Sequence, residues 1–129
     1  MTEPAFIFVY GTLRRDSGHA MSHWLARCTC WYGQGRITGR LYRVSYYPAL
    51  QAGDGQVYGD LYRLENPESV FSVLDAFEGI RGWAEDEYER CLSAVLLENG
   101  ESVMAWVYWY RLSVAALEQV YGGDWLQQK

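Results

Sequence analysis

A glycine-containing loop after an apolar run is the first part of this sequence whose residue types suggest chemistry. Residues 6–9 combine aromatic with β-branched side chains, which is typical of a buried strand. The run stops at Tyr10-Gly11-Thr12-Leu13, where the glycine permits unusual backbone dihedral angles. Backbone N–H groups at the end of such a strand can hold a carboxylate or another anion. We therefore expect Tyr10, Gly11, Thr12 and Leu13 to form a binding site.

Glu78 is the second candidate, because it falls at the predicted end of a helix. Asn66 is a favoured cap, Pro67 suits the first helical position and Gly79 is a typical stop, so the helix should end at Glu78. A carboxylate there opposes the helix dipole, and it follows Phe77, which the apolar stripe predicts to be buried. Both effects raise a carboxyl pKa, which suits a general base near neutral pH. The alternative is a solvent-facing glutamate, tolerated at about half a kcal/mol.

Other catalytic arrangements find less support in the sequence. Asp75 lies one helical turn before Glu78, but nothing else suggests the two acids of a glycosidase. A solvated or locally hydrogen-bonded side chain explains Asp75 better. No G-x-S-x-G elbow is present, and the single glycine after Tyr10 matches neither a P-loop nor a dinucleotide fingerprint.

The cysteines and histidines do not have the spacing of a metal site. Cys28 and Cys30 are separated by one residue, and Cys91 supplies no second pair. His19 and His23 can share a helix face, which leaves a two-His, two-Cys set conceivable. We expect buried or partly buried thiols, no disulfide framework and no metal.

Composition excludes several classes of function. The 129 residues are 50% hydrophobic and include six tryptophans and eleven tyrosines, which predicts one packed domain over residues 1–129. A net charge of −5 and the absence of a basic run argue against nucleic-acid binding. The first residues carry no positive charge, and the apolar run is too short for a signal peptide or a membrane span. We expect a cytoplasmic protein without a membrane partner; the sequence indicates no oligomeric state.

An internal repeat predicts two strands of one curved sheet. Residues 35–44 and 55–64 both read G-x-[IV]-x-G-x-L-Y-R-[VL], with the alternation of strands. Gly39 and Gly59 should mark a sharp coil or bulge in each strand, which lets a small sheet curl towards a barrel. The proline-interrupted segment 45–50 between the copies should be a loop.

The remaining elements are two helices and a hairpin. Residues 19–27 predict a short helix capped by Ser17 or Gly18, and Ser113 should cap a helix that runs through Val120. An Asn-Gly turn joins the predicted strands at residues 88–97 and 103–110, and a loop over 80–86 precedes them. The predicted fold is therefore α+β: a small, strongly curved, mostly antiparallel β-barrel of about six strands, flanked by two or three helices.

Four motifs together resemble the γ-glutamylcyclotransferase-like superfamily, most closely its small γ-glutamylamine cyclotransferase branch. Their order and spacing extend over nearly the whole chain. The motifs are Val9-Tyr10-Gly11-Thr12-Leu13-Arg14, Tyr47-Pro48-Ala49-Leu50, Val57-Tyr58-Gly59-Asp60-Leu61-Tyr62, and Leu74-Asp75-Ala76-Phe77-Glu78-Gly79 followed by Tyr88-Glu89-Arg90.

The resemblance implies a barrel with a cavity at its mouth, in which residues 10–13 bind a γ-glutamyl group through main-chain amides. It also implies that Glu78 is the catalytic acid-base. Tyr88, Tyr108 and Tyr110, on the predicted hairpin strands, could line a pocket with their hydroxyl groups, although core packing with one polar tip is the default for such tyrosines. Of the three, Tyr88 and Tyr108 are further expected substrate-binding residues.

The reaction that the resemblance implies is intramolecular. The α-amine of a γ-glutamyl compound attacks its own γ-carbonyl, which releases an amine and forms 5-oxoproline without metal or cofactor. The leaving amine should contact residues 46–50 and 80–87. Two alternatives stay open: a non-catalytic binder or sensor of a γ-glutamyl or other small carboxylated ligand in the same cavity, and a scaffold for protein contacts through a tryptophan-rich surface.

Overall fold

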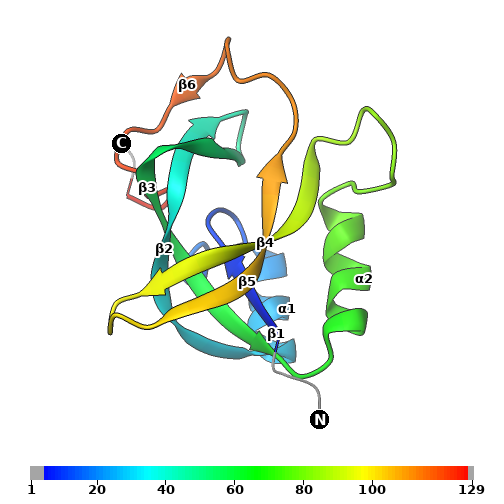
Figure 1. Cartoon of the computed structure of the whole chain (residues 1–129). Coiled ribbons are helices and arrows are strands. Elements are labelled where there is room, and N and C mark those ends of the chain that lie inside the picture. The colour runs from blue at the N-terminus through cyan, green and yellow to red at the C-terminus, as the bar shows by residue number, and fades with distance from the viewer. Residues whose placement is uncertain (1–4, 128–129) are drawn as a thin grey trace.

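Six strands and two helices make up residues 5–127, the part of the chain that the structure, a computed structural model, describes (Figure 1). In chain order the elements are β1 (Ala5–Val9), α1 (Ala20–Cys28), β2 (Cys30–Arg43), β3 (Pro48–Leu64), α2 (Pro67–Phe77), β4 (Tyr88–Leu97), β5 (Ser102–Tyr110) and β6 (Glu118–Gln119).

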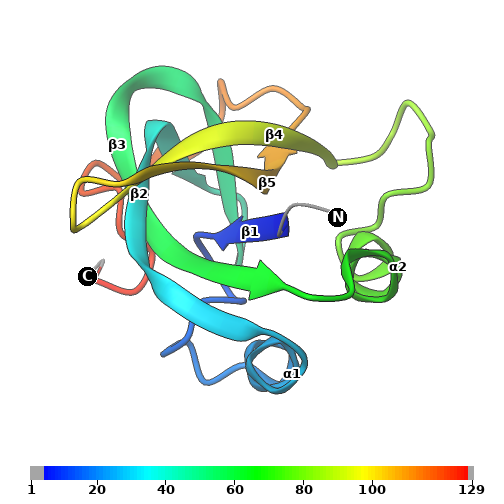
Figure 2. The same ribbon diagram turned by 60° about the horizontal axis from the view of Figure 1, so that its bottom comes forward.

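Five of the strands close into a barrel, and the helices lie outside it (Figure 2). The strand order is β3-β1-β5-β4-β2-β6, and pairing of β3 with β2 closes the ring while β6 stays outside. All neighbours are antiparallel except β1 and β5. The predicted α+β class and the curved, mostly antiparallel barrel are confirmed.

β1 is buried on both faces, which explains its uninterrupted apolar sequence. Phe8 and Tyr10 point into the core that fills the barrel. Ile7 and Val9 point the other way, into a second cluster that includes residues of α1 and α2, such as Leu25. The strand that leads to the candidate loop is therefore held rigidly by packing from both sides.

The internal repeat forms the long β2–β3 ribbon, as predicted. Gly35 lies opposite Gly59, and the register shifts between Thr38 and Arg40, so the bulge predicted at Gly39 is present. No register shift occurs at Gly59. A Cβ atom there would instead overlap the carbonyl oxygen of Val9 and approach Phe8 Cζ to 2.7 Å. Gly59 is needed because β1 passes so close.

Gly59→Ala should lower the free energy of unfolding by about 3 kcal/mol, because the added methyl group meets backbone that cannot yield without opening the barrel. Urea unfolding measures the loss. Gly122→Ala is the matched control, since no atom lies within 4 Å of its built Cβ. Equal unfolding midpoints for the two variants would contradict this account of Gly59.

The predicted helix from Ser113 through Val120 is wrong. The Ser113 hydroxyl does accept a hydrogen bond from the Ala115 N–H, as a cap would (3.2 Å). The chain then makes one turn and adds β6 to the edge of β2, and the Val120 N–H donates to the Leu41 carbonyl (2.7 Å). Pairing with a distant strand therefore overrides the local helix signal.

Two smaller predictions also need correction. His19, rather than Ser17 or Gly18, caps α1, because its Nδ1 accepts from the Met21 N–H (3.0 Å). Pro48 begins β3, so the predicted loop over 45–50 is only four residues long, 44–47. Proline is tolerated at the first residue of a strand.

The hairpin and the second helix match their predictions more closely. β4 and β5 flank the Asn-Gly turn, in which Gly100 has a φ of +88°. Asn66 occupies the N-cap of α2 without a side-chain hydrogen bond. Phe77, however, is 41% exposed rather than buried.

Candidate active site

One cavity brings together Glu78, residues 10–13, Tyr88 and Tyr108, whereas Tyr110 does not line it. It lies where β1 ends, and its volume is about 40 Å³, more than a single water molecule needs. Of the two segments predicted to contact the leaving amine, residues 46–50 contribute Tyr47 and Pro48 to the cavity, whereas no residue of 80–87 lines it. The cavity is lined by Phe8, Val9, Tyr10, Gly11, Thr12, Leu13, Tyr47, Pro48, Glu78, Tyr88 and Tyr108.

The loop after β1 is shaped by close packing, not by an unusual glycine conformation. Gly11 is not among the glycines with positive φ, so the dihedral reason given for it is wrong. A Cβ atom at Gly11 would lie 2.6 Å from Pro48 Cγ and 2.8 Å from Cδ. Within residues 5–127, no acceptor is bonded to the N–H groups of Gly11, Thr12 or Leu13. The loop therefore offers unpaired backbone donors beside the cavity.

The end of α2 fixes the position of Glu78. Gly79 has a φ of +74°, its N–H donates to the Ala76 carbonyl (3.1 Å), and the Ile80 N–H donates to the Asp75 carbonyl (2.9 Å). These two bonds form a Schellman motif, the usual glycine-dependent helix end. Glu78 is the C-cap residue of α2, and its side chain lines the cavity.

The Glu78 carboxyl group is suited to exchange protons near neutral pH. Burial raises its pKa to about 7, and the negative charges of Asp75 and Glu87 act in the same direction. The sequence predicted that a buried Phe77 would shield Glu78, but the Phe77 ring is exposed. The residues that line the cavity bury Glu78 instead. No side chain of residues 5–127 hydrogen-bonds to the Glu78 carboxylate, so the group is free to act on a ligand.

Asp75 is held by an ion pair outside the cavity. Arg90 donates to both of its oxygens, from Nε (2.9 Å) and Nη2 (3.1 Å), and the Tyr108 hydroxyl donates to Oδ1 (2.7 Å). Asp75 was predicted to be solvated or locally hydrogen-bonded; it is hydrogen-bonded, but its partners lie 15 and 33 positions away, on β4 and β5. Both carboxylate oxygens of Asp75 already accept hydrogen bonds, so Asp75 acts on Glu78 indirectly. Its negative charge raises the pKa of Glu78, and its hydrogen bond to the Tyr108 hydroxyl fixes a side chain that lines the cavity.

Asp75→Asn should lower the pKa of Glu78 from about 7 towards its usual value near 4.5. The substitution removes a negative charge and leaves Arg90 uncompensated, and both changes favour ionised Glu78. A ¹³C NMR titration of the Glu78 carboxyl carbon measures the shift without any assay of activity. Glu89→Gln is the control, because Glu89 is not a cause of the Glu78 shift. An unchanged midpoint in Asp75→Asn would refute this coupling.

Three tyrosines build rigid, neutral walls. The Tyr10 hydroxyl donates to the Tyr108 carbonyl, and the Tyr88 hydroxyl donates to the Pro48 carbonyl (2.6 Å). Burial raises the pKa of Tyr10, Tyr88 and Tyr108, so all three stay protonated. These tyrosines therefore pack in the core with one polar tip and also line the cavity.

The thiols and histidines take no part in this cavity. Cys28 and Cys30 are exposed and Cys91 is half-buried, so the expectation of buried thiols is wrong for the first two. No group of three or more His, Cys, Asp or Glu residues in 5–127 is arranged to hold a metal ion. Over the same residues, neither helix has the length and apolar character to cross a membrane.

A five-stranded closed barrel with two outer helices is the fold of γ-glutamylcyclotransferase-like proteins. The family model described as "Gamma-glutamyl cyclotransferase, AIG2-like" matches residues 7–127, and the chain belongs to this family.

Relatives and solved structures agree with this assignment. The chain is 34% identical over 122 residues to the γ-glutamylcyclotransferase family protein YtfP of Escherichia coli K12, a match that covers 95% of this chain and 96% of YtfP. The solution NMR structure of E. coli YtfP superposes with a TM-score of 0.65 at 33% identity and covers 95% and 96% of the two chains. The crystal structure of an AIG2-like protein from Mus musculus gives a TM-score of 0.69 at 24% identity, covers 99% and 86%, and shows the shared fold.

Proposed function

We propose that the protein is a γ-glutamylcyclotransferase that acts on γ-glutamyl amines. The observation that carries this proposal is the Glu78 carboxyl group, with a pKa of about 7, facing the same small cavity as the unpaired N–H groups of the loop. A base with this pKa is half ionised at neutral pH, where the substrate's α-amine is mostly protonated. The family membership of the chain supports the same reaction class.

In the proposed reaction, Glu78 removes a proton from the α-ammonium group of the substrate. The freed nitrogen attacks the γ-carbonyl carbon, and a C–N bond forms as the bond to the departing amine breaks. Glu78 returns its proton to the departing nitrogen, and the second proton that the attacking nitrogen loses as it becomes the lactam N–H passes to the released amine, which leaves as an ammonium ion. The products are 5-oxoproline and a free amine, no water is consumed, and Glu78 finishes ionised as it began.

Gly11, Thr12 and Leu13 have a positioning role in this scheme. Their N–H groups bind the carboxylate or carbonyl oxygen of the γ-glutamyl group, while the Tyr10, Tyr88 and Tyr108 rings confine its chain in a folded shape. Holding the amine against the carbonyl converts an unfavourable encounter into a prearranged one, which in comparable reactions removes roughly 7–11 kcal/mol of the barrier.

Mass spectrometry of 5-oxoproline tests the proposal. The protein is incubated with a panel of γ-glutamyl amines, γ-glutamyl dipeptides and γ-glutamyl-lysine. We expect equimolar 5-oxoproline and amine from at least one substrate. N-acetylation of the α-amine of that substrate should abolish product, because the nucleophile is then blocked. Binding of the panel without any turnover would overturn the enzyme proposal and favour a ligand sensor.

A further inference from the structure

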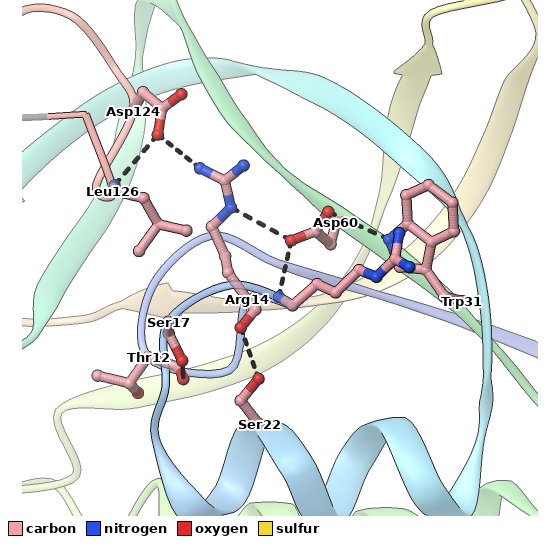
Figure 3. Close-up of polar contacts among 9 residues, drawn as sticks. Thr12, Arg14, Ser17, Ser22, Trp31, Asp60, Asp124 and Leu126 are labelled. Carbon is pink, nitrogen blue, oxygen red and sulfur yellow. Dashed lines mark hydrogen bonds and ion pairs between the residues drawn. The ribbon is translucent and has the colours of Figure 1, made fainter.

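Arg14, the residue that follows the candidate binding loop, is a buried cation outside the cavity. It is 5% exposed. Its Nε lies 3.3 Å from Asp60 Oδ2 and its Nη1 lies 2.6 Å from Asp124 Oδ1 (Figure 3). A buried guanidinium is destabilising unless it is well paired, and a buried ion pair is itself weak evidence for stability. The burial of Arg14 between two carboxylates therefore suggests a role other than stability.

Asp60 ties Arg14 to two strands of the barrel. It is 2% exposed and lies on β3, and it also accepts hydrogen bonds from the Arg15 N–H (2.9 Å) and the Trp31 indole N–H (3.2 Å). The Arg15 guanidinium lies 4.2 Å from the centroid of the Trp31 ring. One carboxylate therefore joins the end of the loop to both β2 and β3.

Asp124 brings in the C-terminal segment, residues 120–127. The Tyr58 N–H donates to the Gly123 carbonyl (2.8 Å), and Trp125 is buried in the barrel core. Asp124 thus sits between two residues that are fixed on the barrel. Its Oδ1 also accepts from the Leu126 N–H (3.1 Å), which orients the carboxylate towards Arg14 (Figure 3).

Two serines, one before α1 and one within it, donate hydrogen bonds to carbonyl groups in and just after the loop. The Ser22 hydroxyl donates to the Arg14 carbonyl (2.6 Å), and the Ser17 hydroxyl donates to the Thr12 carbonyl (2.5 Å). Together with Asp60 and Asp124, these contacts fix the loop from outside. None of them uses the N–H groups of Gly11, Thr12 or Leu13, which stay available.

We propose that Arg14, Asp60 and Asp124 are positioning residues that align the loop amides with Glu78, so that the C-terminal segment is a working part of the site. The inference rests on the proposed function for its kinetic consequences. Its structural consequence, a loop whose order depends on Asp124, can be measured without substrate. A merely structural ion pair would instead stabilise the whole barrel evenly.

Hydrogen exchange of backbone amides in Asp124→Ala tests this directly. We expect exchange at the Arg14 and Ser17 amides, which donate to the Gly11 and Arg14 carbonyls at the end of the loop (3.0 and 3.1 Å), to quicken by about tenfold or more, while strand amides of the barrel keep their wild-type rates. Asp124→Asn, which retains a neutral acceptor for Arg14, should restore part of the protection. Unchanged loop exchange, or an equal rise throughout the barrel, would overturn the proposal.

Kinetics give the second readout. In Asp124→Ala, kcat/KM for 5-oxoproline formation should fall by about tenfold or more, because a displacement of the loop misaligns the substrate. The NMR titration midpoint of Glu78 should stay near 7, since Asp124 is not among the charges that shift it. Asp54→Ala, which breaks the exposed ion pair with Arg40, is the matched control.

Arg14→Lys is the second variant if Asp124→Ala fails to fold. Lysine keeps the buried charge but lacks the planar fork that bridges two carboxylates. It should give the same local rise in loop exchange. Wild-type exchange at the loop in a folded Arg14→Lys protein would count against the proposal. Absence of turnover in the wild-type protein would refute the proposed function and leave the exchange test intact.

Discussion

Glu78→Gln should lower kcat for 5-oxoproline formation by about 10²–10⁴-fold while the protein stays folded. Glutamine has the shape of glutamate but cannot accept the proton of the α-ammonium group. Among the described residues no other carboxylate lines the cavity, and both oxygens of Asp75 are hydrogen-bonded to Arg90. No second side chain can therefore replace Glu78 as the base. Initial rates at saturating substrate measure the loss, and Glu89→Gln should retain wild-type kcat.

The same variant should be more stable than the wild type above pH 7. The folded-state pKa of Glu78, about 7, exceeds the ordinary value of 4.5, so the folded protein holds this proton more tightly than the unfolded chain. Stability therefore falls as pH rises from about 4.5 to 7, and glutamine removes that loss. Urea unfolding at pH 8 should show a gain on the order of 1–3 kcal/mol. Retained activity in Glu78→Gln would contradict the assigned role, and lowered stability would indicate a structural glutamate.

Gly11→Val should abolish detectable binding of γ-glutamyl ligands, a loss of about 10²-fold or more. The valine Cβ would come within 2.6 Å of the Pro48 ring, which is rigid. The Pro48 carbonyl also accepts the Tyr88 hydroxyl, so neither the loop nor its neighbour can move without deforming the cavity. The overpacking should lower the free energy of unfolding by about 1–3 kcal/mol and leave the domain folded.

Isothermal titration calorimetry with a γ-glutamyl amine, at a pH where turnover is slow, measures this loss. Gly122→Val is a suitable control, because its built Cβ has no neighbour within 4 Å. Gly11→Ala should show an intermediate affinity. Normal binding by a folded Gly11→Val protein would mean that the loop is not the recognition element.

The barrel could be predicted well because its strands contain local sequence signals. The alternating repeat over 35–44 and 55–64 and the Asn-Gly turn each depend on residues close together in the chain. The C-terminal segment was mispredicted because its structure depends on a partner elsewhere: Gln119 pairs with Tyr42, on β2. A serine cap cannot report such a pairing.

The candidate site divides in the same way. The positions of the loop and of Glu78 could be predicted from the end of an apolar run and from a glycine helix stop, both of which are local. The reason that position 11 must be glycine could not be predicted, because that reason is the close approach of Pro48, which lies at the start of β3. The links from Arg14 to Asp60 and Asp124 span 46 and 110 positions, and no periodic pattern records them.

The pH dependence of kcat/KM for 5-oxoproline formation tests the central claim most directly. If Glu78 in its ionised form starts the cyclisation, kcat/KM should rise with pH and reach half its maximum near pH 7, the pKa of the free enzyme's base. Asp75→Asn should move that midpoint to lower pH, in step with its NMR titration. A kcat/KM that is constant between about pH 5 and 8 would contradict the account, because a carboxyl group with this pKa would then not be the base.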